Sequence, residues 1–365
     1  MDLDSVRLKS PRPASMLPAE SSHPAFARRH CFDRTRLTPH ALRLTPYASL
    51  ISRLHQQRAQ RSERGNEAHQ GRPTSNTYIT KMADDSFSLA SRIKLNKGAS
   101  MPRLHLGVYL MSASEASKAV TSALEAGYRA FDSAQMYRNE RHVGNSILEY
   151  LKTHPEVRRQ DIHYTSKLAS NSDYERARKS IAKSVKECGL GYIDLFLLHS
   201  PYGGKQARLE SWRAVEDAIE AGEVRIGGVS NFGTKHIDEL LASNPRIKPA
   251  VNQIEVHPFN TRTALTEHCI KNDIVVEAYA PLARALRMEH PTIVELAKKY
   301  SCTSGQLLVR WSLQHGFVPL PKSVRKERIV GNVSIEHFKI NEADMKKMDD
   351  LDEYLVTDWN PVDTD

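Results

Sequence analysis

The chain has 365 residues, of which 40% are hydrophobic and 26% charged, as is usual for globular proteins. No apolar run is long enough to cross a bilayer, which predicts a soluble protein without a membrane partner. Most of the net charge of +9 lies in residues 1–81, where 14 Lys and Arg stand against six Asp and Glu. Residues 82–365 are therefore nearly neutral, so the high net charge of the chain gives no reason to expect nucleic acid as a partner of the folded part.

The segment 1–81 differs from the rest of the chain. It is rich in Arg, Ser, Pro and His and shows no sustained apolar period. Such a composition buries too little apolar surface to offset the entropy of ordering, so we expect disorder. Three origins remain open: a targeting presequence that would send the protein to mitochondria, a tail, or a product of the gene model with Met82 as the true start. Its diffuse charge and few aromatic residues argue against nucleic-acid binding.

Residues 82–365 are predicted to form one folded domain that begins with a short β-hairpin. Ile93–Leu95 and Leu104–Leu106 are apolar-rich segments that flank Lys97 and Gly98. A glycine between two such segments is typical of a hairpin turn.

Capping signals and amphipathic patterns predict the helices. Ser112 and Glu115 have the spacing of a capping box, and Gly127 stands where a helix stop is expected, which predicts a helix over 114–125. Further apolar-periodic stretches predict helices at Tyr174–Cys188, Glu210–Ala221, Lys235–Ala242, Thr263–Lys271 and Ser304–His315.

Short apolar strands alternate with these helices. The predicted strands are Leu104–Gly107, Arg129–Asp132, Ile162–Lys167, Ile193–His199, Arg225–Ser230, Ala250–Ile254, Ile274–Tyr279 and Val318–Pro321. Alternation of this kind indicates a parallel sheet with helical crossovers. Eight such units predict an α/β fold of the (β/α)8 TIM-barrel type.

Polar residues end several of these strands. Asp132, Lys167 and His199 stand at the ends of the second, third and fourth strands. Each alone has a structural explanation: the aspartate as a loop cap, the lysine as a rim residue, the histidine as a core residue. Because active sites of such barrels lie at the carboxyl ends of the strands, the three together predict a catalytic site.

Several motifs together carry a specific resemblance. They are GYRAFDSAQMYRNERHVG, YTSKL, IDLFLLHSP, GGVSNFG, VNQIEVHP and PLPKSV, the last followed by Arg328 and Asn332. Over about residues 90–360 the chain resembles the aldo-keto reductase superfamily, in particular its microbial branch of diketogluconate and aldehyde reductases. The resemblance implies a cytoplasmic enzyme that reduces small or sugar-derived aldehydes and ketones with NADPH, as a monomer or weak dimer.

The resemblance also implies the catalytic roles. Tyr137 would be the general acid that protonates the carbonyl oxygen as hydride arrives. A free tyrosine has a pKa near ~10, so the Lys167 ammonium would lower it. Asp132 would pair with that lysine, and His199 would hydrogen-bond and orient the substrate carbonyl.

The cofactor is expected at the barrel mouth, in line with the lack of a GxGxxG motif. Ser230, Asn231 and Gln253 would bind the nicotinamide carboxamide, and Tyr279 would stack on its ring. Further contacts are expected from Gly107, Val108, Asp132 and Leu282.

A second group of residues would bind the adenosine end of the cofactor. Lys322, Ser323 and Arg328 match positions that hold the 2′-phosphate, and Asn332 would contact adenine. Two cations near one phosphate favour NADP(H) over NAD(H), because they form charge-assisted hydrogen bonds with it.

Substrate contacts are expected near the mouth, from Tyr109, Met136, His199, Tyr202 and Trp359. Ser200–Lys205 is expected to be a short polar loop. The tail Tyr354–Asp365 is expected to fold over the mouth, and its polar end favours small hydrophilic aldehydes or keto acids.

Two further expectations concern the alternative function and the cysteines, beside the catalytic tetrad of Asp132, Tyr137, Lys167 and His199. The alternative function is a non-catalytic, nicotinamide-binding regulatory subunit, against which the full set of four catalytic residues argues. Cys31, Cys188, Cys269 and Cys302 show neither CxxC nor metal-ligand spacing, which predicts a reduced intracellular protein without a metal site.

Overall fold

The structure, a computed structural model, describes residues 87–365. The predictions for residues 1–81, the boundary at Met82 and Cys31 lie outside these residues. Within 87–365, none of the helices combines the length and the apolar character that crossing a membrane requires.

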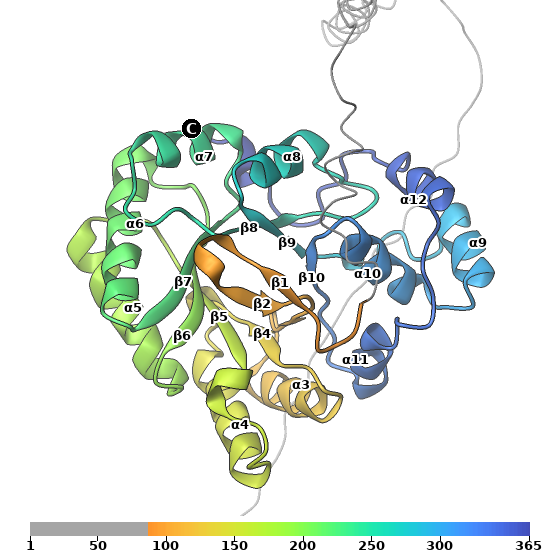
Figure 1. The fold of residues 1–365 in the computed structure, drawn as a ribbon, viewed down its shortest axis with the longest axis horizontal. Helices are drawn as coiled ribbons and strands as arrows, with labels where there is room; N and C mark the ends of the chain where they lie inside the picture. Colours follow the sequence, from red (N-terminus) through yellow and green to blue (C-terminus); the bar gives the residue numbers. More distant parts are fainter. Residues whose placement is uncertain (1–86) are drawn as a thin grey trace, which may run out of the picture. The chain divides into compact units, whose positions relative to one another are not determined.

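Eight parallel strands form a barrel in the order of the chain (Figure 1). They are β3 (Leu106–Gly107), β4 (Ala130–Asp132), β5 (His163–Leu168), β6 (Ile193–Leu198), β7 (Val224–Ser230), β8 (Val251–Glu255), β9 (Val275–Tyr279) and β10 (Val318–Leu320). Two backbone hydrogen bonds of 3.2 Å close the ring between its first and last strands, from His105 to Pro319 and from Gly107 to Pro321. The predicted TIM-type barrel is confirmed.

The N-terminal hairpin is present, but its second arm is not the predicted one. β1 (Arg92–Lys94) pairs in antiparallel fashion with β2 (Ser100–Pro102). The expected arm Leu104–Leu106 instead leads into β3, where Leu106 pairs with Phe131. The turn is responsible for this difference, because the backbone N–H of Leu95 donates to the Ala99 carbonyl at 2.8 Å and the chain reverses earlier.

The hairpin covers one end of the barrel, and Figure 1 shows it in front of the strands. Leu95 and Met101 from the hairpin pack against Leu195, Val251 and Val318 of the barrel interior. Apolar side chains therefore fill this end of the barrel, and the polar residues of the interior lie toward its other end.

Helices form the outer layer of the barrel. They are α3 (Ala113–Glu125), α4 (Glu140–Thr153), α5 (Tyr174–Cys188), α6 (Gly204–Glu220), α7 (Thr234–Ala242), α8 (Thr263–Lys271), α9 (Pro291–Lys299), α10 (Ser304–Gln314), α11 (Lys326–Val333) and α12 (Glu342–Asp349). The capping box of Ser112 and Glu115 is present at the start of α3. Two predicted helices, now α5 and α8, have the bounds that the sequence indicated.

One predicted loop is shorter than expected. Helix α6 begins at Gly204, inside the segment Ser200–Lys205 that we expected to be a loop. Gly203 precedes it with a φ of 104°, a backbone conformation that suits glycine and turns the chain into the helix.

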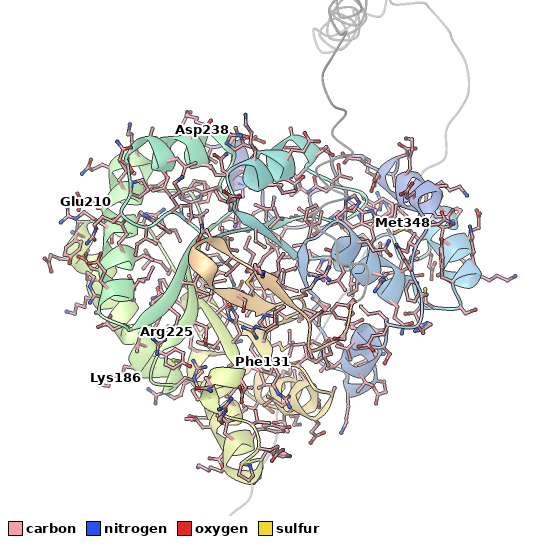
Figure 2. The ribbon with its side chains drawn as sticks, viewed as in Figure 1. Phe131, Lys186, Glu210, Arg225, Asp238 and Met348 are labelled. Atoms are coloured by element: carbon pink, nitrogen blue, oxygen red, sulfur yellow. The ribbon has the colours of Figure 1, made fainter. Side chains whose placement is uncertain are left out.

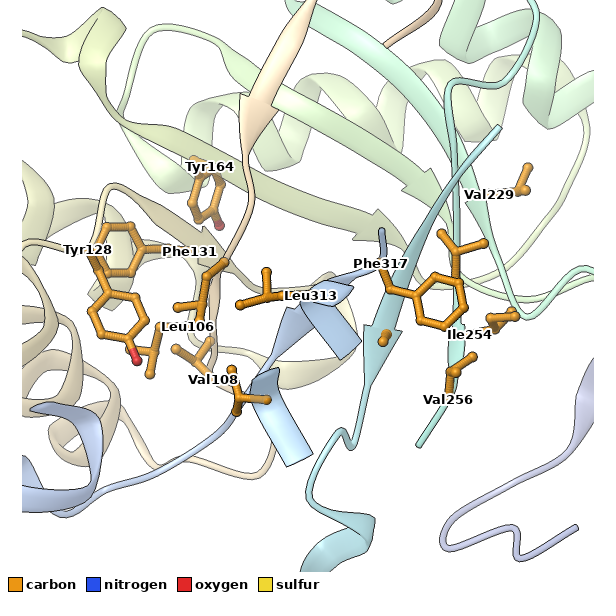
Figure 3. Close-up of a cluster of buried hydrophobic side chains, with 14 of the residues drawn as sticks. Leu106, Val108, Tyr128, Phe131, Tyr164, Val229, Ile254, Val256, Leu313 and Phe317 are labelled. Atoms are coloured by element: carbon orange, nitrogen blue, oxygen red, sulfur yellow. The ribbon is translucent and has the colours of Figure 1, made fainter. Parts of the chain in front are cut away.

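Buried hydrophobic side chains fill the space between strands and helices (Figure 3). Residues of each strand alternate between the two faces, so Phe131 points toward the helices while Asp132 points into the barrel. Charged side chains such as Lys186, Glu210 and Asp238 lie at the outer edge (Figure 2). The fold thus separates a dry helix-facing core from a barrel interior that can hold polar groups.

Helices α4 and α5 pack so closely that one glycine is required. A Cβ at Gly144 would lie 1.7 Å from the Cys188 carbonyl oxygen. Gly144→Ala is therefore expected to lower the free energy of unfolding by about 3 kcal/mol, as overpacking does. Urea denaturation measures this change. Gly331→Ala is the control, because a Cβ on that glycine of α11 meets nothing within 4 Å. Equal unfolding midpoints for the two variants would contradict the expectation.

Candidate active site

Four predicted residues come together at the carboxyl ends of the strands. Asp132 ends β4, and Tyr137 lies on the short helix η2 (Gln135–Tyr137) that follows it. Lys167 lies near the end of β5 and His199 directly after β6. The structure therefore places the tetrad on adjacent strands, as the strand order predicted.

The Lys167 ammonium is fully buried and uses all of its donors. It donates to Asp132 Oδ1 at 2.7 Å, to the Ser133 carbonyl at 2.9 Å and to the Tyr137 hydroxyl oxygen at 3.2 Å. An ammonium has three donors and no lone pair, so the tyrosine oxygen is the acceptor. The phenolic proton of Tyr137 is thus left free for another acceptor.

Tyr137 holds its proton firmly. Burial raises the pKa of its phenol well above the usual range, and the negative charge of Asp132 raises it further. This direction is opposite to the lowering that we expected from Lys167. The reason is that the ammonium is already paired with Asp132, so desolvation of the phenolate outweighs the attraction of one cation.

His199 is a neutral hydrogen-bonding group in this site. Burial and the Lys167 charge lower the pKa of its imidazole to about 3. Its ring lies edge-on to Tyr137, with centroids 5.7 Å apart, and edge-on to Trp359 at 6.0 Å. A neutral imidazole donates one N–H, which suits it to orient a carbonyl oxygen and does not make it the proton source.

Aromatic side chains surround the tetrad, and the predicted substrate residues are among them. The Tyr109 ring lies 5.0 Å from Tyr137, and Tyr202 lies 5.7 Å from Trp359, both measured between ring centroids. Met136 is 56% exposed beside Tyr137. The tail therefore brings Trp359 to the mouth, as expected.

The residues expected to bind the nicotinamide form one polar group. Asn231 donates to the His199 carbonyl at 3.0 Å, and its Oδ1 accepts from the Tyr279 hydroxyl at 2.9 Å. Ser230 donates to the Gln253 carbonyl at 2.9 Å. Gln253 donates to Asp132 Oδ2 at 2.9 Å, and within residues 87–365 nothing donates to its Oε1. That oxygen is available to accept from a carboxamide.

The residues expected at the adenosine end follow β10. Lys322 and Arg328 are exposed, and within residues 87–365 neither side chain has a hydrogen-bond or ion-pair partner. Ser323 and Asn332 are buried. The other expected contacts are the buried Gly107 and Val108 and the half-buried Leu282. Two cationic side chains without a partner can form charge-assisted hydrogen bonds with a phosphate.

Hydrogen bonds hold the C-terminal tail on the barrel. The backbone N–H of Thr357 donates to Glu255 Oε1 at 2.9 Å, and its hydroxyl donates to the same carboxylate. At the chain end, His236 Nε2 lies 2.8 Å from the Thr364 carbonyl oxygen. We did not predict Glu255 as a functional residue, although it occupies an inward position two residues after Gln253.

Two ion pairs join the C-terminal segment 353–358 to the loop after β9. Arg284 lies 3.0 Å from Asp358, and Arg287 lies 2.9 Å from Glu353. Four non-glycine residues of this loop have left-handed backbone conformations: Ala280, Ala283, Arg284 and Ala285. Such conformations are unfavourable for residues with a Cβ, so surrounding contacts must hold them.

No cluster of residues within 87–365 has the composition of a metal site. Cys188 and Cys269 are buried, Cys302 is half-buried, and all three are free thiols. Burial raises the pKa of each thiol to about 11. None of the three is therefore a thiolate near neutral pH.

Comparison with known proteins agrees with the fold and with the motifs. Residues 103–353 match the Aldo/keto reductase family. An uncharacterized oxidoreductase of Schizosaccharomyces pombe is 45% identical over 273 residues, which cover 75% of this chain and 98% of that protein. Glyoxal reductase of Bacillus subtilis is 37% identical over 276 residues, covering 75% of this chain and 97% of the enzyme.

Solved structures show the same likeness. The Bombyx mori aldo-keto reductase in complex with NADP superposes with a TM-score of 0.70 at 33% identity, covering 74% of this chain and 95% of that one. An aldo-keto reductase from a Medee basin deep-sea metagenome library gives a TM-score of 0.70 at 35% identity, with 75% and 100% covered. The microbial branch stays a prediction. The chain belongs to the aldo/keto reductase family of oxidoreductases.

Proposed function

We propose that the protein reduces small aldehydes and ketones to alcohols with NADPH, and that Tyr137 is the general acid. The observation that carries this proposal is the geometry of Lys167. All three of its N–H donors are in use, and one of them holds the oxygen of Tyr137. The phenolic proton is therefore available to a carbonyl placed at the mouth.

The residues at the mouth fit a nicotinamide dinucleotide. Gln253 Oε1 is an available acceptor, and Lys322 and Arg328 are unpaired cations within residues 87–365. Support also comes from the Bombyx mori relative, whose structure contains NADP. When bound, the dihydronicotinamide supplies hydride to the carbonyl carbon.

Residues of this chain donate the proton and stabilise the charge that remains. Tyr137 donates its proton to the carbonyl oxygen, and the Lys167 ammonium stabilises the phenolate that remains. Asp132 keeps that ammonium charged and in place. The neutral His199 donates an N–H to the carbonyl oxygen and thereby orients the substrate.

Turnover measurements test this function directly. The purified chain is incubated with NADPH and a panel of short aldehydes, aldoses, uronates and keto esters, and NADPH oxidation is followed together with alcohol formation. We expect turnover with at least one class of carbonyl. Tight NADPH binding without any turnover would contradict the proposal and favour a non-catalytic, nicotinamide-binding protein.

Trp359 is expected to contribute to substrate binding. Its ring packs against His199 and Tyr202, so its removal should leave one side of the barrel mouth open. Trp359→Ala is expected to raise KM by about tenfold with a much smaller effect on kcat, because apolar contacts of this size are worth ~1–3 kcal/mol. Steady-state kinetics measures both constants. Val294→Ala, which shortens an exposed apolar side chain on α9, is the control. A decrease in kcat that is larger than the increase in KM would exclude a binding role.

A further inference from the structure

A second polar group lies inside the barrel, one layer below the tetrad. Residues of a strand alternate between its faces, so Glu277 points inward like Tyr279 two residues later. Glu277 pairs in register with Gln253 on one side and Val318 on the other. It has no exposed surface, and neither does His105. The proposed mechanism uses neither residue.

The hydrogen bonds around these two residues require one more proton. His105 Nε2 lies 3.0 Å from the Pro102 carbonyl oxygen, which only accepts, so this nitrogen carries the hydrogen. In a neutral imidazole the Nδ1 atom is then an acceptor. It lies 3.3 Å from Glu277 Oε1, and both atoms are buried without another partner. Two buried acceptors in contact are satisfied only when a proton lies between them.

We propose that Glu277 and His105 share this proton, and that the neutral glutamic acid is a positioning residue for the tetrad. Its other oxygen, Oε2, accepts from Gln253 Nε2 at 2.7 Å, and the same amide nitrogen donates to Asp132 Oδ2. The amide of Gln253 is thereby fixed with its oxygen turned to the mouth. The role in turnover rests on the proposed carbonyl reduction.

Burial and the surrounding charges favour the proton on the glutamate side of the pair. Burial and the nearby Asp132 carboxylate raise the pKa of Glu277 to about 8, against the opposing effects of Gln253 and Lys167. Burial lowers the pKa of His105 well below its usual range and that of His163, which contacts His105, to about 3. The Arg92 charge on β1 lowers the pKa of both imidazoles.

Ionisation of Glu277 would change the chemistry above it. A second negative charge beside Asp132 would raise the pKa of Tyr137 further and make it a weaker acid. The kcat for reduction is therefore expected to fall by about tenfold as the pH rises through about 8, since a nearby charge shifts a pKa by ~1 unit or more.

The variant Glu277→Gln has the shape of the neutral acid but cannot ionise. Its amide oxygen can accept from Gln253 and its nitrogen can donate to His105. We expect the alkaline step in kcat to disappear in this variant. His105→Phe removes the acceptor that stabilises the neutral form of Glu277. The pKa of Glu277 should therefore fall, and the alkaline decrease in kcat is expected at a lower pH in this variant. Glu140→Gln is the matched control, because Glu140 is a buried carboxyl that bonds to Ser166 on the outer face of β5. An unchanged step in Glu277→Gln would overturn the proposal.

Unfolding measurements test the proton pair without any turnover. The folded pKa of Glu277 is raised, so its stabilising effect is complete below the unfolded pKa of ~4.3 and is lost as the pH rises toward about 8. Over this range the ratio of the unfolding constants of the parent and Glu277→Gln is expected to grow by up to about tenfold per pH unit. If this ratio grows with pH in a protein that reduces no carbonyl, the proposed function is wrong, but the proton shared by Glu277 and His105 is supported. A ratio that does not change with pH would refute the shared proton.

Discussion

Replacing Tyr137 by phenylalanine is expected to lower kcat by about a thousandfold, because general acid catalysis contributes ~10²–10⁴-fold. The substitution removes the hydroxyl that accepts from Lys167 at 3.2 Å and carries the free proton. The neutral His199 cannot replace it, since an imidazole with a pKa of about 3 holds no second proton near neutrality. Steady-state kinetics with the best carbonyl of the panel measures the loss.

Cofactor binding separates this chemical role from a structural one. The Kd for NADPH, followed by protein fluorescence, is expected to change by less than about threefold in Tyr137→Phe, because the ring and its packing remain. Tyr174→Phe is the matched control, as its hydroxyl bonds to Asp217 between the outer helices α5 and α6. Turnover retained in Tyr137→Phe would rule out this tyrosine as the acid. Loss of both binding and turnover would instead indicate a damaged fold.

The barrel was predictable because its signals are local. Strands such as β6 are almost wholly apolar, as buried parallel strands are, and the caps of α3 and α5 lie within a few residues of the helices they begin. Helix α4 was not predicted, since its 14 residues are interrupted by Gly144. That glycine breaks the helical pattern in sequence but is required by the contact with Cys188.

The tetrad was predictable as a set, whereas the groups that control it were not. Tyr137 and Lys167 lie in recognisable motifs at strand ends. The direction of the tyrosine pKa depends on burial, which no motif reports. His105 and Glu277 are 172 positions apart in the sequence, and their contact depends on how the barrel closes. The attachment of Thr357 to Glu255 likewise joins residues far apart in the chain.

Removing the two unpaired cations is expected to abolish the preference for NADPH over NADH. In the parent protein we expect NADPH to bind at least about a hundredfold more tightly, because hydrogen bonds to charged groups contribute ~1.5–3 kcal/mol each. The double variant Lys322→Ala with Arg328→Ala should weaken NADPH binding by that factor. Its affinity for NADH should change little, since NADH has no 2′-phosphate for these side chains to bind.

A matched control shows whether the effect comes from these two cations or from the positive charge of the region. Lys326 lies in the same segment, but its ammonium is 2.7 Å from the Glu125 carboxylate and is already paired. Lys326→Ala is therefore expected to retain the preference for NADPH. Equal affinities of the parent for the two cofactors would refute the assignment of Lys322 and Arg328. A similar loss in Lys326→Ala would show that the general charge of this surface, and not a defined phosphate site, selects the cofactor.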